Sequence, residues 1–472
     1  MELPYRGSGD IFFNDNKYRC DLYYSEKLGG IVIKVNVKNE KIIGNFLELP
    51  IEISCLHGQL DSGFHFALLD LFRTSMQDLV SYGTSVYTFE AKHILCGFNK
   101  EEQIEPTFYK VEYVLSNIVE WGEMSIYEIG EKHELISKID DVKKTVYKNS
   151  DFSITYLVRG SFLPFSNRDL LKESIKLEQF GVVEIEFNTE RNLNSFDDVF
   201  MRLQRLVEIA SLHKINVEKV YAYSKNIHYD IQERTIERAI EVYGRNIKEA
   251  KESDTKLGRS WHWITLTELI NQNSFEKYFD KYEKLEPIIE LFLEPFHSQG
   301  FSRRRMFLNI VQALETYHSR FVATTLKEFK DRVNDLIKAL SGEQQEKTKE
   351  FLLANSRGFI TLESRVSDLL LANWQIHFDT GEINHEKFPS VITHSRHYYT
   401  HYDENIKQKE RILAEEELQI YNRALLKILE YYILLELGFS EDVTNIRGKL
   451  NERWGNISQE LEILKLSREK QE

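Results

Sequence analysis

The segment VITHSRHYYTHYDEN, residues 391–405, concentrates side chains that can transfer protons or hold phosphate. It contains three histidines, one arginine and three tyrosines. Because His397 and His401 are four residues apart, they would face the same side of a helix, as two ligands of a zinc site do. His394 would add a third imidazole along that face. The metalloprotease form of this motif has Glu directly after the first His, where this chain has Tyr398. A second interpretation gives the histidines and tyrosines only packing and capping roles in a helical bundle.

Arg396 and His401 support a third interpretation, the cleavage of a phosphodiester. A guanidinium binds phosphate through a planar fork of donors, and an imidazole exchanges its proton near neutral pH. Five residues of regular helix turn through about 140°, so the two side chains would diverge on an undistorted helix. Convergence requires a helix start, a distortion or the long reach of Arg. Pro389, just upstream, is typical of a helix that begins near residue 390.

Composition limits the classes of protein to which the chain can belong. Its 472 residues exceed one ordinary domain, and 42% hydrophobic with 29% charged residues is typical of a globular protein. The sequence has no apolar run long enough to span a membrane and no signal peptide at its start, so we expect a cytoplasmic protein. Cys20, Cys55 and Cys96 form no CxxC pair, which suits a reducing compartment and predicts neither a zinc site nor disulfides. A net charge of −14 requires any nucleic-acid contact to be a local basic patch.

The hydrophobic pattern changes once along the chain. Up to about residue 190, segments such as IVIKVNV and SVYTFEAKHILCGF alternate apolar and polar residues, which predicts a β-rich domain over residues 1–190, built as an antiparallel sheet or a sandwich. The period then becomes helical. We expect a mainly helical connecting region over 191–299, in which Trp261 and Trp263 around His262 pack in a core or a domain interface. A helical bundle should follow over 300–465, with a short tail over 466–472. The predicted fold class is therefore α+β and multidomain.

The helical half resembles a known family. Arg396 to His401 matches the RxxxxH motif of HEPN ribonucleases, and the surrounding segments are similar as well: QALETYH at 312–318, LESRVSDLL at 362–370 and a closing helix LLKILEYYILLELGF. Residues 300–465 resemble the HEPN domain of the ApeA group of bacterial antiphage proteins, and the β-rich half is similar in size and character to the ApeA N-terminal domain. One difference is His397, because many HEPN ribonucleases have Asn directly after the Arg.

The resemblance implies a metal-independent endoribonuclease that needs no cofactor and acts on RNA, with tRNA favoured, during phage infection. Two HEPN domains would pair in a homodimer so that both motifs line one cleft. His401 would activate the ribose 2′-hydroxyl or protonate the leaving oxygen, and Arg396 would hold the scissile phosphate. The β-rich half would act as a sensor of a phage-derived trigger. The alternative is a non-catalytic, HEPN-like regulatory protein that binds a nucleotide or a partner. The sequence contains no Gly-rich phosphate loop, which argues against an ATP-driven mechanism.

Several further residues are candidates for supporting roles, each with a structural alternative. Glu315 could orient Arg396 or a histidine, or it could be an ordinary surface carboxylate. Arg303, Arg304 and Arg305 form the densest basic run and could bind RNA backbone, although a helix start capped by Ser302 with arginines facing solvent explains them equally. The three tyrosines of the motif segment, Tyr398, Tyr399 and Tyr402, could stack on unpaired bases, while at least one of them should pack in the bundle.

Overall fold

The computed structural model describes most of the chain. The described residues are 6–14, 16–25, 30–38, 49–79, 83–99, 105–116, 118–137, 142–160, 173, 177–231, 234–244, 264–297, 300–322, 331, 333–335, 337–338, 340–354, 361–370, 385–440, 443–455, 457, 459–460 and 462–463. The chain divides into two compact units. One comprises Met1–Val207, Ile215–Ser260 and Thr265–Thr267, and the other comprises Glu208–Lys214, Trp261–Ile264 and Glu268–Glu472.

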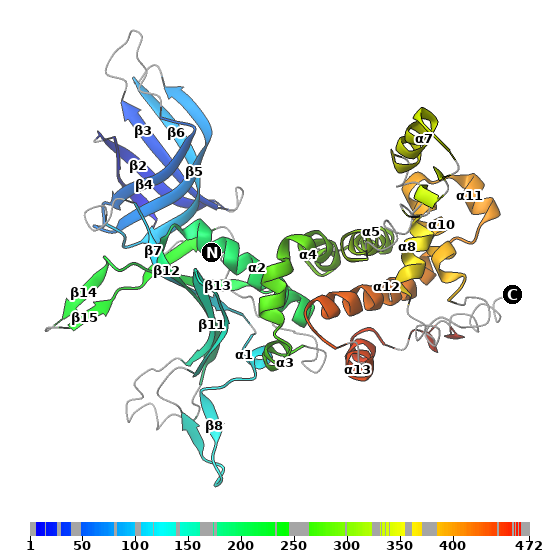
Figure 1. Cartoon of the computed structure of the whole chain (residues 1–472). Helices are drawn as coiled ribbons and strands as arrows, with labels where there is room; N and C mark the ends of the chain where they lie inside the picture. Colours follow the sequence, from blue (N-terminus) through cyan, green and yellow to red (C-terminus); the bar gives the residue numbers. More distant parts are fainter. Residues whose placement is uncertain are drawn as a thin grey trace. The chain divides into compact units, whose positions relative to one another are not determined.

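The first unit contains a closed, barrel-like antiparallel sheet (Figure 1). Its strands are β1 (Gly7–Phe13), β2 (Asn16–Ser25), β3 (Gly30–Lys38), β4 (Glu52–Leu60), β5 (His65–Leu79) and β6 (Thr84–Cys96). The ring closes because β6 pairs with β3 on one side and with β5 on the other. Burial alternates residue by residue over the first part of β6, which is the period-two pattern that the sequence predicts. The inward-facing residues form one apolar core, including Ile33, Val35, Phe66 and Phe89.

The sheet continues beyond the ring through the end of β6, which pairs with β16 (Ile240–Gly244). The order from there is β13 (Val217–Tyr223), β7 (Phe108–Leu115), β12 (Gln179–Arg191), β11 (Phe152–Gly160) and β10 (Val142–Lys148), all antiparallel. Helix α2 (Leu193–Ser211) packs on this part of the sheet, with Phe200 stacked on Tyr113 at 3.9 Å between ring centroids. The short helix α1 (Val119–Gly122) and two hairpins, β8 (Tyr127–Ile129) with β9 (Leu135–Ser137) and β14 (His228–Ile231) with β15 (Arg234–Glu237), complete the described elements.

The region over 191–299 differs from our expectation. It contains α2, α3 (Leu266–Asn271) and α4 (Ser274–His297) as predicted, but also strands β13 to β16, of which β13 and β16 belong to the main sheet. We missed these strands because each has only four to seven residues, too few for a clear alternation between two helical patterns. Residues 261–263, with Trp261, His262 and Trp263, lie outside the described residues.

The second unit is helical. Besides α4 its described helices are α5 (Arg303–Phe321), α7 (Glu343–Ala354), α8 (Leu362–Leu369), α10 (Phe388–His401), α11 (Glu404–Lys409), α12 (Glu415–Glu436) and α13 (Val443–Trp454). Most residues of α12 between Glu417 and Leu434 are buried, and α5 packs against α4, α8, α10 and α12. The apolar face predicted for α5 is buried, including Phe307, Ile310 and Leu314. The predicted combination of a β-rich part followed by a helical bundle is therefore confirmed.

A buried ion pair joins α12 to α13. The Nε of Arg453 lies 2.8 Å from Glu430 Oε1, both side chains are fully buried, and Trp454 donates its indole N–H to the same carboxylate. Arg453 also donates to the backbone oxygens of Ile209 and Ala210, at 2.7 and 2.8 Å. Burial raises the pKa of Glu430 and lowers that of Arg453, because both charged forms lose hydration. Removing either Arg453 or Glu430 would therefore leave the other as a buried charge without its partner.

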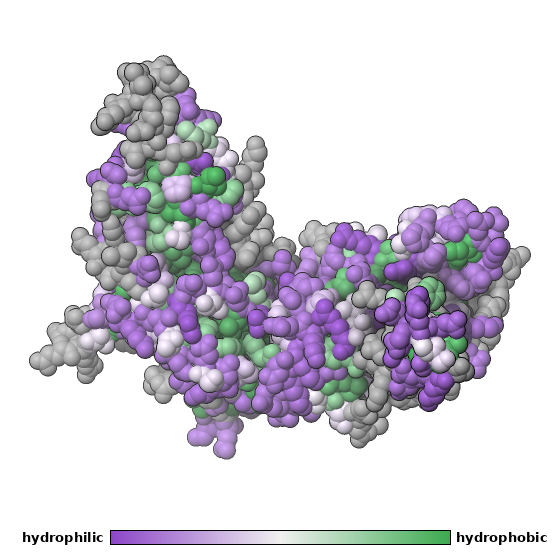
Figure 2. Space-filling view, turned by 45° about the horizontal axis from the view of Figure 1, so that its top comes forward, coloured by the Kyte–Doolittle hydropathy of each residue, from purple (hydrophilic) through white to green (hydrophobic). Residues whose placement is uncertain are grey.

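The described surface is largely polar on the face seen in Figure 2, where hydrophilic residues predominate and hydrophobic residues form small groups. Among the helices that the structure describes, none has the length and apolar character needed to cross a lipid bilayer.

Candidate functional site

Helix α10 carries the motif segment as far as His401 and begins where the sequence predicts. Pro389 occupies its first turn, and Phe388, Val391 and Ile392 are buried. Two further residues of the same face fix the helix to the start of α12: the Ser395 hydroxyl accepts from the backbone N–H of Leu413 at 3.0 Å, and Tyr399 donates to the backbone oxygen of Leu413 at 2.6 Å. Tyr399 is therefore the packed tyrosine of the segment. This anchoring turns the remaining motif side chains away from the core.

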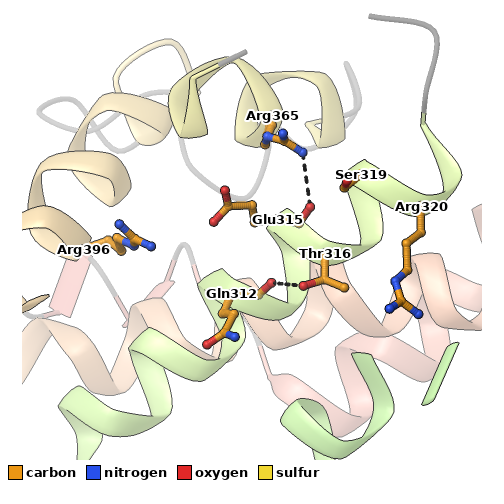
Figure 3. Close-up of a pocket in the computed structure, with 7 residues that line it drawn as sticks. All are labelled: Gln312, Glu315, Thr316, Ser319, Arg320, Arg365 and Arg396. Carbon is orange, nitrogen blue, oxygen red and sulfur yellow. Dashed lines mark hydrogen bonds between the residues drawn. The ribbon is translucent and has the colours of Figure 1, made fainter. Parts of the chain in front are cut away.

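Arg396 lines an open pocket of about 460 Å³ between α5, α8 and α10 (Figure 3). The other lining residues are Gln312, Glu315, Thr316, Ser319, Arg320 and Arg365. In Figure 3 the carboxylate of Glu315 and the guanidinium of Arg396 extend toward each other from facing helices. The predicted meeting of Glu315 with Arg396 at one cleft is thus compatible with the geometry, while the role of Glu315 stays a prediction.

His401 lies elsewhere on the helix. It is exposed at the C-terminal end of α10 and is not among the described residues that line the pocket. Its ring is 4.9 Å from that of His397, which is also exposed. The next residue, Tyr402, ends the helix in the left-handed conformation with φ of 53°. Because α10 stays helical from Arg396 to His401, the divergence of about 140° expected for a regular helix applies, and one chain alone does not bring both side chains into one pocket.

The zinc interpretation has only the two neighbouring imidazoles to support it. Within the described ranges, no group of three or more His, Cys, Asp or Glu side chains is arranged to hold a metal ion. His394, the third imidazole of the segment, has its Nδ1 3.3 Å from Glu410 Oε2. That contact links His394 to the C-terminal end of α11, where Glu410 is the capping residue.

The consecutive arginines begin α5. Ser302 caps the helix by accepting from the backbone N–H of Arg305 at 3.2 Å, as the structural alternative expected. Two of the three guanidinium groups are paired with carboxylates: Arg304 Nε lies 2.7 Å from Glu415 Oε2, and Arg305 forms an ion pair with Glu294. Arg303 lies 3.5 Å from the backbone oxygen of Glu415. RNA binding by this run stays a prediction, and much of its charge is already balanced within the protein.

Arg320 and Arg365 were not singled out from the sequence. The polar residues of α5 that line the pocket, from Gln312 to Arg320, recur at helical spacing opposite its apolar face, and this stripe was a usable signal. Arg365 had no such signal, because only the packing of α8 against α5 and α10 brings it there.

Two family models match the chain. The model described as ApeA N-terminal domain 1 matches residues 5–282, which is more than half of the chain, and the one described as Apea-like HEPN matches residues 308–443. The chain belongs to the ApeA family. The HEPN match of this ApeA-like chain includes all seven described residues that line the pocket around Arg396, and the N-terminal match includes strands β13 to β16. Comparison with curated proteins and with solved structures finds no match. Membership associates the chain with antiphage defence and its helical domain with ribonuclease activity.

Proposed function

We propose that this ApeA-like chain is an endoribonuclease that cleaves RNA, with tRNA favoured, by attack of the ribose 2′-hydroxyl and without a metal ion. The observation that carries the proposal is the environment of Arg396. Its guanidinium lines a polar pocket inside the HEPN match and, among the described residues, has no carboxylate within ion-pair distance, while an exposed histidine ends the same helix. An arginine that is unpaired among the described residues, on the same helix as an accessible imidazole, supplies the two chemical groups needed to handle a phosphodiester, although one chain does not bring them together.

The proposed reaction is a transfer within the RNA strand. One base removes the proton of the 2′-hydroxyl, the O2′–P bond forms, the P–O5′ bond breaks, and an acid protonates the departing O5′. The products are a 2′,3′-cyclic phosphate and a 5′-hydroxyl. His401 serves as the base or the acid, and Arg396 binds the non-bridging oxygens and stabilises the negative charge that develops on them.

Pairing of two copies would complete the site. Arg396 and His401 diverge on one helix, so a cleft that contains both functions is more easily formed when two α10 helices face each other. The exposed side chains of His397, His401 and Tyr402 are then available to that cleft. We therefore propose a homodimer through the HEPN domain, with the N-terminal unit acting as the sensor of a phage-derived trigger.

The deciding experiment incubates the purified full-length protein with total RNA and follows cleavage on a denaturing gel, with and without EDTA. We expect fragments in both conditions, ending in 2′,3′-cyclic phosphate, and no cleavage of DNA, which lacks the attacking hydroxyl. RNA that stays intact while the protein binds it would favour the alternative, a non-catalytic nucleotide- or partner-binding protein. Cleavage that EDTA abolishes would favour the zinc interpretation.

A further inference from the structure

The pocket beside Arg396 collects positive charge from three helices of an acidic protein. Arg320 comes from α5, Arg365 from α8 and Arg396 from α10, and Glu315 is the one acidic residue among the described lining residues, whose three positive groups and one negative group give a net charge of +2. Among the described residues, neither Arg365 nor Arg396 has a carboxylate within ion-pair distance. The run Arg303–Arg305 differs, because two of its members are paired with Glu415 and Glu294.

The position of Arg365 is fixed by the elements around it. Thr361 caps α8 by accepting from the backbone N–H of Ser364 at 3.1 Å, and Val366 on the same helix is buried. Asp368 attaches the helix to α5 through a contact of 2.8 Å with Nε2 of the buried His318. The guanidinium of Arg365 itself donates to the backbone oxygen of Glu315 at 3.5 Å, the contact drawn in Figure 3.

Arg320 is in a different situation, although it lines the same pocket. It donates to the backbone oxygens of Glu283 and Lys284 on α4, at 3.0 and 2.9 Å. In Figure 3 its side chain extends away from Arg396. Its role is therefore to hold α5 on α4, which leaves Arg365 as the second cation available to a ligand.

The chemistry of the lining indicates the part of a ligand that fits. All seven lining residues that the structure describes are polar or charged, and none of these seven is aromatic. A base would need an apolar or aromatic surface on which to stack, whereas a sugar-phosphate backbone needs cations and hydrogen-bonding groups such as the side chains of Gln312, Thr316 and Ser319. The pocket is open rather than closed around a small molecule, which suits a continuous strand.

We propose that Arg365 is an RNA-binding residue that holds a backbone phosphate next to the one held by Arg396. The inference rests on the proposed function, because it assumes that the RNA strand cut at the motif segment also runs across α8. Arg365 acts on the affinity for RNA, while Arg396 and His401 act on the reacting phosphate.

The test measures binding apart from cleavage. The probe is a fluorescein-labelled single-stranded 2′-O-methyl RNA, which lacks the attacking hydroxyl, and fluorescence anisotropy is recorded with the full-length protein at several salt concentrations. We expect Arg365→Ala to weaken binding by about tenfold to a hundredfold, the range for a hydrogen bond between charged groups. The slope of log K against log salt, which is negative, should become less steep by about 0.7, the value for one phosphate contact on a single strand. Arg365→Lys keeps the charge but loses the planar fork, and should lie between wild type and Arg365→Ala.

Lys347→Ala is the control, because it removes one positive charge from the helical unit at an exposed position outside the pocket, on α7, where Lys347 pairs with Glu343. It should bind within about twofold of wild type. Equal affinities for the Arg365→Ala and Lys347→Ala variants, or a wild-type protein that does not bind the probe, would overturn the inference. If Arg365→Ala does not fold, as judged by circular dichroism, Arg365→Lys decides, and unchanged affinity in that variant overturns it. Failure of the proposed function is separate, because it appears as absent cleavage of unmodified RNA by the wild-type protein.

Discussion

Replacing His401 with alanine is the sharpest test of the proposed chemistry, because the structure separates the effect on catalysis from the effect on folding. His401 is exposed at the end of α10, and its described contact is the ring of His397. A substitution at such a position changes the free energy of unfolding by about 0.5 kcal/mol or less. Loss of a general acid or base lowers the rate by about a hundredfold to ten-thousandfold, which corresponds to roughly 3 to 5 kcal/mol in the activation barrier. The catalytic effect should exceed the folding effect several times over.

Two further variants make the test specific to the pair. His397→Ala removes a second exposed imidazole on the same helix. It should lower cleavage less than His401→Ala, because His397 only stands where many HEPN ribonucleases have a polar Asn directly after the Arg. Arg396→Ala should lower cleavage at least as much as His401→Ala, because the guanidinium both binds the phosphate and stabilises its developing charge.

The assay is single-turnover cleavage of a 5′-labelled RNA with and without EDTA, with the product end identified as a 2′,3′-cyclic phosphate. Thermal denaturation of each variant confirms that folding is unchanged. Cleavage by the His401→Ala variant at the wild-type rate would refute the reasoning and return the motif segment to a packing role. Equal losses in His397→Ala and His401→Ala, together with sensitivity to EDTA, would indicate a metal site.

Three other predictions concern assembly, control and stability. The full-length protein should be a homodimer in light scattering at micromolar concentration, because two motif segments are needed to line one cleft; a monomer would contradict this. Deleting residues 1–190 should uncouple antiphage protection from its trigger, and protection equal to that of the full chain would argue against a sensor. The deletion also removes β7, on which β13 pairs, so circular dichroism must show that the remaining chain folds. Arg453→Met should reduce the free energy of unfolding in urea by about 3 to 5 kcal/mol, because it leaves the carboxylate of Glu430 buried without its partner, and a loss below about 1 kcal/mol would show that Glu430 is neutral or hydrated.

The sequence alone determined those features that depend on local periodicity and local chemistry. Alternation over Thr84–Cys96 indicated a strand with one buried face, and the apolar spacing over Arg303–Phe321 indicated an amphipathic helix. Pro389 indicated the start of α10, and Ser302 the start of α5. These predictions succeed because backbone geometry sets the periods of strands and helices, so that a short stretch of residues carries the whole signal.

The tertiary structure decided which distant residues meet. Local patterns do not predict that β6 pairs with both β3 and β5 to close the sheet, or that the short strand β13 pairs with β7. These pairings depend on register and on hydrogen bonds between segments that are far apart in the chain. The same holds for charge. The consecutive arginines at 303–305 formed the clearest basic signal in the sequence, yet folding provides carboxylates for two of them, whereas Arg365 and Arg396, thirty-one positions apart, come to line one pocket through the packing of α8 and α10 on α5. Electrostatic character depends on neighbours in space, and the sequence fixes only neighbours along the chain.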